Sequence, residues 1–482
     1  MYKPILILFL IALSLPLAAE PAPFVWLNDS ATGRMVYALF RNSVELETVP
    51  QQAEIHLYAD SRYHLMVNGT FVNFGPLRAY PQHPYYDTYD IIPYLKPGEN
   101  VIAVKVLSNG MNTFQLPYSI GGFSAWGEIR DNGRAYRLDT PGSWRCARSK
   151  AYDPTAPKMS FAAGPIEVVD GRKQLTGWTE PGFDASDWQK PVAVRDQDHW
   201  GTLKPRYLPH LTQNMVTPKH LVKSAALSVA EDIYSFRIKL PDRTRRDTGA
   251  DNWLYGYTYI YSPREQEVQA GLWWGEYWLN GVDVKPEFDK IGRNNHTLTP
   301  LPLKKGWNFF FMEYKVFQAL WDFYMAVPDS ADLVFSPTRQ ANSANIFMTA
   351  GPVPTRTDTL GMAGKAEIPY QSHQDLPDFL GPWQGQKRSS TAGNPAWDMA
   401  WRLPEHDLNF PSHQVSDITL TDESALVFDM GGKILGRIFI EYDAPVGTNI
   451  DIGFAEDLTR DSLASVLKRP GIYTATRHIS GG

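Results

Sequence analysis

Apolar and polar residues alternate over short segments along most of the chain, and Gly, Pro and Asn separate these segments. In residues 55–59 and again in residues 63–67, the apolar side chains fall on every second position. A period of two is typical of strands with one buried face, so both segments predict β-strands. Asn68-Gly69 follows the second segment and predicts a hairpin closed by a two-residue turn.

The same plan recurs further along the chain. Asn280-Gly281 repeats the Asn-Gly turn 212 positions after Asn68, and Asn308 repeats Asn100 after 208 positions. The two spacings differ by four residues, and a surface loop can differ in length by this much at little cost in free energy. We therefore predict a mainly β protein with two antiparallel sandwiches in tandem, of the jelly-roll, galactose-binding-like type, over residues 20–212 and 213–350. Chance similarity is the alternative, because Asn-Gly turns are common in hairpins.

The last part of the chain divides into two segments. Residues 351–394 lack the alternation and are rich in Gly and Pro, which predicts a linker or a wrapping segment. In residues 395–482 the alternation returns, and residues 438–442 and 450–454 predict an antiparallel pair of strands. Because a complete sandwich takes about 100 residues, we expect this region to form a partial third sandwich.

The N-terminus predicts export. Residues 1–19 combine Lys3, an apolar run and the small residues Ala18 and Ala19, as a secretory signal peptide does. The apolar run is short for a membrane span, so we expect a secreted or periplasmic protein with no membrane association after cleavage; an uncleaved anchor is the alternative. Cys146 is the single cysteine, so internal disulfides cannot stabilise the chain.

Length and charge narrow the class of protein further. A chain of 482 residues has room for two to four domains of roughly 100–200 residues each. The formal net charge is −6, from 46 basic and 52 acidic residues, so we expect no nucleic-acid partner. The 37 Pro, 36 Gly, 15 Trp and 24 Tyr residues indicate a turn-rich β protein with much aromatic surface.

Motifs for nucleophilic, nucleotide or zinc chemistry are missing from the sequence. Residues 122–126 resemble the Gly-x-Ser-x-Gly motif of esterases but have Trp in place of the second Gly. Residues 431–436 lack the Gly-Lys-Ser/Thr ending of a phosphate-binding loop. No His-x-His or His-Glu-x-x-His occurs, so we expect no metal centre and no cofactor, with a structural calcium ion as an open alternative. Carboxylate pairs could serve glycoside hydrolysis, but spacing alone does not select one.

Two aromatic clusters are candidates for binding sugars. Trp and Tyr rings stack on the apolar face of a pyranose, while nearby polar groups bond its hydroxyls. Because adjacent strand residues point to opposite faces, about half of each cluster must instead fill the core. The predicted carbohydrate-binding residues are Tyr86, Asp87, Trp126, Trp273 and Trp274.

Three strings of residues resemble the exported bacterial α-L-rhamnosidases. The first is Tyr-Asp-Thr-Tyr-Asp-Ile at 86–91 with Leu-Lys-Pro-Gly-Glu-Asn at 95–100. The second is Glu-Val-Val-Asp-Gly-Arg at 167–172 with Pro-Gly-Phe-Asp-Ala-Ser-Asp-Trp at 181–188. The third is Phe-Asp-Met-Gly-Gly at 428–432 with Pro-Val-Gly-Thr at 445–448. They occur in the order that the family has.

This resemblance implies that the chain is the N-terminal, non-catalytic portion of a secreted glycoside hydrolase. In that family two carboxyl groups in a helical (α/α)6 barrel cleave the glycoside, and nothing in this sequence resembles the barrel, so we assign no catalytic residue. The implied partner is a plant or microbial glycan that contains rhamnose. A stand-alone carbohydrate-binding protein and a glycosidase complete within these residues are the alternatives, and the sequence does not determine the oligomeric state.

Overall fold

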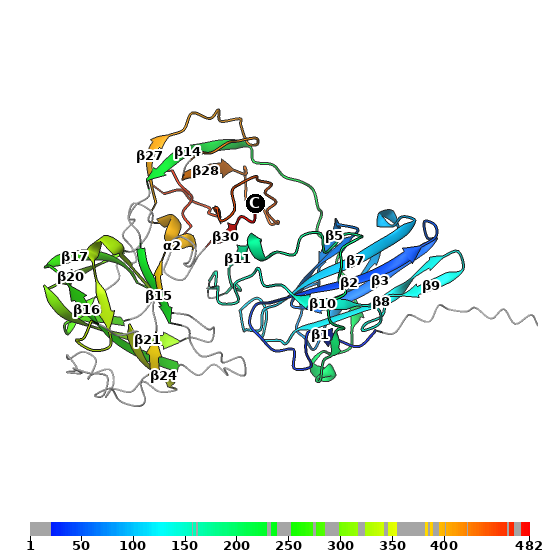
Figure 1. The fold of residues 1–482 in the computed structure, drawn as a ribbon, viewed down its shortest axis with the longest axis horizontal. Coiled ribbons are helices and arrows are strands. Elements are labelled where there is room, and N and C mark those ends of the chain that lie inside the picture. The colour runs from blue at the N-terminus through cyan, green and yellow to red at the C-terminus, as the bar shows by residue number, and fades with distance from the viewer. Residues whose placement is uncertain are drawn as a thin grey trace, which may run out of the picture.

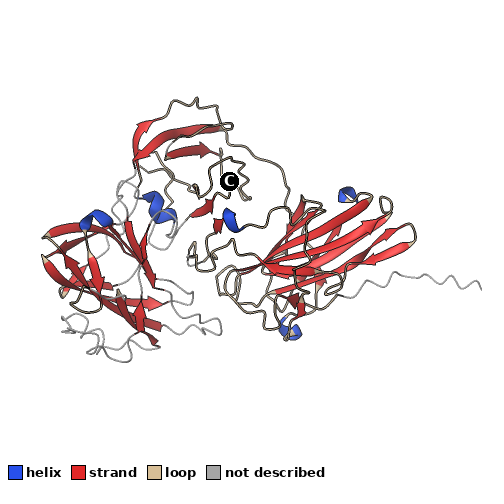
Figure 2. Cartoon of the chain, viewed as in Figure 1, coloured by secondary structure: helices blue, strands red, loops and turns tan. Residues whose placement is uncertain are grey.

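The structure is a computed structural model. It describes residues 21–156, 158–160, 162–228, 233–238, 252–272, 276–284, 298–316, 323–341, 346–353, 381–383, 386–388, 395–400, 402–421, 423–459, 462–466 and 474–482. Strands dominate these residues and helices are short, as Figure 2 shows, so the predicted mainly β fold is confirmed. The predicted signal peptide lies outside the described residues. Among the described helices, none has both the length and the apolar character needed to cross a membrane.

The first sandwich packs two sheets against each other and lies at one end of the molecule in Figure 1. One sheet has the strand order β12-β1-β8-β3-β6-β13 with β9 beside β8, and the other has the order β10-β2-β7-β4-β5. The strands are β1 (Val25–Trp26), β2 (Val36–Leu46), β3 (Gln52–Asp60), β4 (Arg62–Val67), β5 (Thr70–Gly75), β6 (Tyr85–Asp90), β7 (Gly98–Ser108), β8 (Gly122–Asp131), β9 (Arg134–Arg137), β10 (Arg145–Arg148), β12 (Val192–Ala193) and β13 (Lys204–Pro205).

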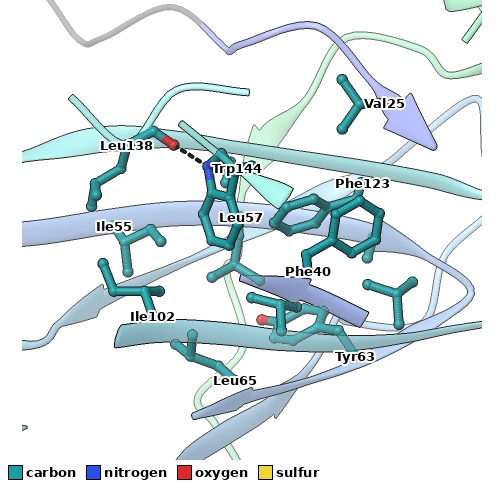
Figure 3. Packing of buried hydrophobic residues seen from close by; sticks show 14 of the residues in the cluster. Val25, Phe40, Ile55, Leu57, Tyr63, Leu65, Ile102, Phe123, Leu138 and Trp144 are labelled. Carbon is teal, nitrogen blue, oxygen red and sulfur yellow. Dashed lines mark hydrogen bonds between the residues drawn. The ribbon is translucent and has the colours of Figure 1, made fainter. Parts of the chain in front are cut away.

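The core of this sandwich lies between its two sheets. Figure 3 shows Ile55 and Leu57 of β3 facing Leu65 of β4 and Ile102 of β7, as the period-two pattern requires. The indole of Trp144 is fully buried and donates a 2.8 Å hydrogen bond to the carbonyl oxygen of Leu138. This bond satisfies the polar end of the ring, so its apolar area is buried without an unpaired donor.

The second sandwich repeats the strand order of the first. Its sheets are β20-β17-β22-β15-β26 and β19-β18-β21-β16-β24-β25, with β23 beside β16, so β16-β21-β18-β19 corresponds to β2-β7-β4-β5. The strands are β15 (Ile233–Ile238), β16 (Asn252–Ser262), β17 (Gln266–Leu272), β18 (Glu276–Leu279), β19 (Val282–Val284), β20 (Leu298–Leu303), β21 (Gly306–Val316), β22 (Phe323–Pro328), β23 (Val334–Ser336), β24 (Phe347–Val353), β25 (Gly381–Trp383) and β26 (Gln386–Arg388).

A pair of asparagines, of which Asn100 and Asn308 are the buried members, holds the same loop in both sandwiches. Asn68 donates to the side-chain oxygen of Asn100 at 2.8 Å, and Asn280 donates to that of Asn308 at 2.8 Å. Both Asn68 and Asn280 adopt the positive φ of the predicted turns, at 51° and 52°. Because backbone conformation and hydrogen bonds repeat together, the predicted tandem repeat is confirmed.

The third region lies between the two sandwiches in Figure 1 and forms two small sheets, β27-β14-β28 and β11-β30-β29. Its elements include strands from before the second sandwich, because β11 and β14 pair with strands of the C-terminal part. The bounds are β11 (Val168–Asp170), β14 (His220–Ser228), α2 (Pro395–Ala400), β27 (Leu403–Asp407), β28 (Ser424–Asp429), β29 (Asn449–Gly453) and β30 (Ala475–Ile479), and the short 3-10 helices are η1 (Ile92–Tyr94), η2 (Gly171–Lys173), η3 (Gln197–His199) and η4 (Asp329–Ala331).

The hairpin predicted from residues 438–442 and 450–454 is wrong. β29 pairs with β30, and residues 438–442 form no strand. Their apolar side chains are exposed instead, with 73% of Phe439 accessible to solvent. The guanidinium of Arg437, just before these residues, lies 3.8 Å from the ring centre of Phe71 on β5. Alternation therefore predicted a strand correctly in β29, but it could not identify the partner, because strand pairing depends on residues distant in sequence.

The predicted linker is partly built into the second sandwich. Residues 351–353 end β24, and β25 and β26 add edge strands to the two sheets of this sandwich. These strands have three residues each, so the alternation that marks longer strands could not reveal them.

Candidate functional site

A hollow opens at one end of the first sandwich, where β3 ends and β4 begins. The hollow contains about 300 Å3 of empty space when its open mouth is counted. The centre of a water molecule can occupy about 20 Å3 of that space. The residues that line this Asp60 hollow are Tyr58, Asp60, Ser61, Pro76, Leu77, Arg78, Ala79, Pro81, Leu116, Pro117 and Ser119. They come from β3, from the chain after β5 and from the chain before β8.

The sheet register brings these three segments to the same edge. Asp60, the last residue of β3, pairs with Gly122, the first residue of β8, and Tyr63 of β4 pairs with Gly75, the last residue of β5. Gly75 has no room for a side chain, because a Cβ atom there would meet Asp87 Oδ2 and would lie 2.6 Å from Tyr63 Oη. The close approach at Gly75 therefore fixes where the chain leaves β5 and enters the wall of the hollow.

Asp60 forms the polar base of the hollow and is nearly fully buried. The hydroxyl of Ser119 donates to its Oδ2, and the indole nitrogen of Trp200 donates to the same oxygen at 3.0 Å. Ser119 also contacts His199 Nε2 at 2.8 Å. Burial raises the pKa of the Asp60 carboxyl above its ordinary value, while these hydrogen bonds act in the opposite direction.

Two donors in the wall have no hydrogen-bond partner within the described part of the chain. One is the phenol of Tyr58, whose ring packs edge-on against Phe24 at 5.8 Å. The other is the guanidinium of Arg78. Burial, and to a smaller extent the charge of Asp60, raise the pKa of Tyr58 well above its ordinary value, so this phenol keeps its proton. Both groups can therefore donate hydrogen bonds to a ligand.

Two exposed aromatic residues lie close in sequence to the lining residues. Tyr80 is 65% exposed and lies between the lining residues Ala79 and Pro81. Phe114 is 68% exposed and lies two residues before the lining residue Leu116. Exposed rings next to a small polar hollow suit a ligand with one apolar face and several hydroxyl groups, as a sugar has.

The hollow is small. Room for a water centre takes about 10–15 Å3, so the 20 Å3 in this hollow holds one or two waters or the hydroxyl groups that replace them. Asp60 is the one carboxylate among the lining residues. Hydrolysis of a glycosidic bond generally requires two carboxyl groups that flank the bond, so the described lining lacks this pair.

The three predicted carbohydrate-binding residues that the structure describes do not line this hollow. Asp87 is fully buried, accepts a hydrogen bond from Tyr63 and forms an ion pair with Arg206. Trp126 is also buried, with its ring 4.9 Å from that of the half-buried Tyr86. Trp273 and Trp274 lie outside the described residues. Sugar binding by these five residues stays a prediction.

Sequence reasoning missed the residues that build the hollow. Asp60 lies between the two segments in which apolar residues alternate, residues 55–59 and 63–67. This interruption of the alternation was the only feature of the nearby sequence that set Asp60 apart. Its partners Ser119 and Trp200 are 59 and 140 positions away, so no motif spacing joins them. Within the residues that the structure describes, no three His, Cys, Asp or Glu side chains come together as a metal site would require.

The comparisons with known proteins bear on the first sandwich above all. Residues 48–210 match the family described as the α-L-rhamnosidase N-terminal domain, and this range contains the whole Asp60 hollow. The resemblance to the N-terminal region of the α-L-rhamnosidases is confirmed. An α-L-rhamnosidase from Streptomyces avermitilis is 28% identical to the chain over 160 residues, which cover 31% of this chain and 14% of that protein.

Solved structures support the fold over more of the chain. The GH78 family rhamnosidase of Bacillus sp. GL1 aligns with 95% of this chain and 51% of its own, at 21% identity and a TM-score of 0.72. The Streptomyces avermitilis α-L-rhamnosidase complexed with L-rhamnose aligns with 96% of this chain and 41% of its own, at 15% identity, but its TM-score of 0.28 is too low to compare folds. The chain thus spans about half or less of the length of these rhamnosidases.

Proposed function

We propose that this chain is the glycan-recognition portion of an exported α-L-rhamnosidase-like glycoside hydrolase that acts on rhamnose-containing glycans. The observation that carries the proposal is the position of the Asp60 hollow inside the segment that matches the rhamnosidase N-terminal domain. The hollow provides the free donors of Tyr58 and Arg78 beside exposed rings, which is the combination that a sugar requires.

Recognition without cleavage is the role that the hollow supports. Its lining offers one buried carboxylate, Asp60, whose Oδ2 already accepts hydrogen bonds from Ser119 and Trp200. A glycosidase of the usual kind needs a second carboxyl group as base or nucleophile. We therefore propose that the first sandwich holds the glycan and that the described residues of the hollow perform no bond cleavage.

The test is calorimetric titration of the purified chain with rhamnose-containing oligosaccharides. We expect saturable binding that weakens about tenfold in Tyr80→Ala, because loss of a stacking ring costs about 1–1.5 kcal/mol. Tyr207→Ala is the matched control, since Tyr207 is similarly exposed, at 68%, but packs against Tyr85 and does not line the hollow. Equal affinity of wild type and Tyr80→Ala would contradict recognition at the hollow.

A turnover assay on an aryl α-L-rhamnoside completes this experiment. We expect no release of the aryl group by the purified chain, and measurable turnover would overturn the non-catalytic role. Export is tested on the same protein. The signal-like pattern of residues 1–19 predicts that the mature chain begins at Glu20, and an exported product that retains Met1 would contradict cleavage.

A further inference from the structure

Two arginines meet beside the Asp60 hollow without an acidic partner. Arg78 lines the wall, and Arg62 directly follows the lining residue Ser61 at the start of β4. Neither guanidinium forms an ion pair or a hydrogen bond with any described residue. The register explains why they are neighbours, because β4 begins beside the end of β5 and Arg78 lies three positions after Gly75, the last residue of β5.

The two positive charges repel each other. Burial lowers the pKa of Arg62, and the charge of Arg78 lowers it further. The charges of Tyr37 and Glu167 act in the opposite direction and raise the pKa of Arg62. The carboxylate of Glu167, however, accepts a 2.7 Å hydrogen bond from the hydroxyl of Tyr37 and not from Arg62. Two like charges that are held together without a direct counter-ion favour the binding of an anion between them.

We propose that Arg62 and Arg78 bind an acidic substituent of the glycan, either the carboxylate of a uronic acid or a sulfate ester. This inference rests on the proposed function, since it assigns the class of sugar that the hollow receives. A guanidinium presents its donors in a planar fork that matches two oxygens of a carboxylate or a sulfate. Arg78 brings such a fork to the hollow itself, next to the free phenol of Tyr58.

Asp60 does not neutralise this arginine pair. Its buried Oδ2 accepts hydrogen bonds from Ser119 and Trp200, and neither arginine donates to it. Alternation along β4 places Arg62 and the buried Tyr63 on opposite faces of their sheet, so the guanidinium of Arg62 points away from the core. An acidic group that enters from solvent therefore meets the arginines at the rim, while sugar hydroxyls reach the polar base.

The experiment compares three probes by calorimetric titration at low and at physiological salt. They are a disaccharide of glucuronic acid and rhamnose, its carboxyl-reduced neutral counterpart, and a rhamnose disaccharide with a sulfate ester. We expect at least one acidic probe to bind about tenfold more tightly than the neutral one, with a preference that shrinks as salt rises. The stronger acidic probe identifies the substituent.

Variants assign the preference to the two arginines. Arg62→Met should reduce the preference for the acidic probe severalfold while leaving affinity for the neutral probe within about twofold. Arg78 also lines the hollow, so Arg78→Met should weaken binding of both probes, and that of the acidic probe severalfold more. Arg78→Lys keeps the charge and loses the fork, so it should restore only part of the preference. Arg134→Met is the control, since Arg134 begins β9 at the opposite end of the sandwich.

The outcomes separate the two proposals. Equal affinity of the wild type for acidic and neutral probes would overturn the arginine assignment and leave glycan recognition standing. Failure of every probe to bind would overturn the proposed function itself. A preference that survives in the double variant Arg62→Met/Arg78→Met, with circular dichroism unchanged, would also overturn the assignment.

Discussion

Asp60 is a carboxyl group whose surroundings give it a raised pKa. It is 6% exposed, and burial outweighs the hydrogen bonds from Ser119 and Trp200 in its effect on the pKa. The folded state therefore holds this proton more tightly than the unfolded chain, where an Asp has a pKa of about 3.9. The contribution of Asp60 to stability thus decreases as the pH rises from about 4 through the raised pKa of the folded state.

Asp60→Asn tests this linkage. The amide keeps an acceptor for the Trp200 indole but does not titrate, so the stability of the variant lacks this pH dependence. We expect the free energy of unfolding of the variant, minus that of the wild type, to increase between about pH 4 and the raised pKa. Urea unfolding followed by tryptophan fluorescence at several pH values measures this difference. A difference that stays constant with pH would show that the pKa of Asp60 is not raised.

Gly75 is a second residue whose role is set by its immediate contacts. A methyl group there would meet the buried Asp87 and Tyr63 side chains, so we expect Gly75→Ala to lower the free energy of unfolding by about 1–3 kcal/mol. Gly432→Ala is the control, because no atom lies within 4 Å of a Cβ at that position. Chemical denaturation of both variants is the measurement, and equal stabilities would contradict the close packing at the end of β5.

At the scale of the element, the asparagine loops are what the two sandwiches share. The side-chain amide of Asn100 donates to the carbonyl oxygens of Lys96 and Gly98, at 2.6 and 2.9 Å. The amide of Asn308 donates to those of Lys304 and Gly306, at 2.8 and 3.1 Å. Both asparagines are fully buried, so removal of either amide leaves backbone carbonyls without their donor.

We predict that Asn100→Ala and Asn308→Ala each lower the free energy of unfolding by about 2–4 kcal/mol, since several buried hydrogen bonds are lost at once. Asn214→Ala is the matched control, because Asn214 is exposed in an extended segment and should change stability by less than about 0.5 kcal/mol. Thermal unfolding by calorimetry measures all three. A loss in only one of the two sandwiches would contradict their structural equivalence.

At the scale of the whole molecule, the third region joins strands from three parts of the sequence. β11 lies between β10 and β12 of the first sandwich in the sequence, β14 precedes the second sandwich, and β27 to β30 lie near the C-terminal end. Residues 434–442 extend from this region with exposed apolar side chains, of which Leu435 is 88% exposed, and Arg437 rests on Phe71 of the first sandwich. Tyr442 contacts His478 of β30 within the third region. Side-chain contacts thus hold this segment, whereas strand pairing does not.

This arrangement predicts that residues 438–442 tolerate charge. Ile440→Lys should change the melting temperature by no more than about 1–2 °C, because the side chain is already half-exposed. Ile102→Lys places the same charge in the core of the first sandwich and should prevent its folding. Thermal melts of both variants provide the measurement. A large loss for Ile440→Lys would mean that residues 438–442 pack as the strand that their alternation predicted.

The sequence by itself determined what depends on near neighbours: the period-two strands, the Asn-Gly turns at positive φ, the tandem repeat and the resemblance to the N-terminal region of α-L-rhamnosidases. Tertiary structure alone decided which strands pair and which side chains meet. β29 pairs with β30 rather than with residues 438–442, and Asp60 meets Ser119 and Trp200 across 59 and 140 positions. Local patterns fix backbone conformation, but a site assembled from distant segments depends on how whole sheets pack.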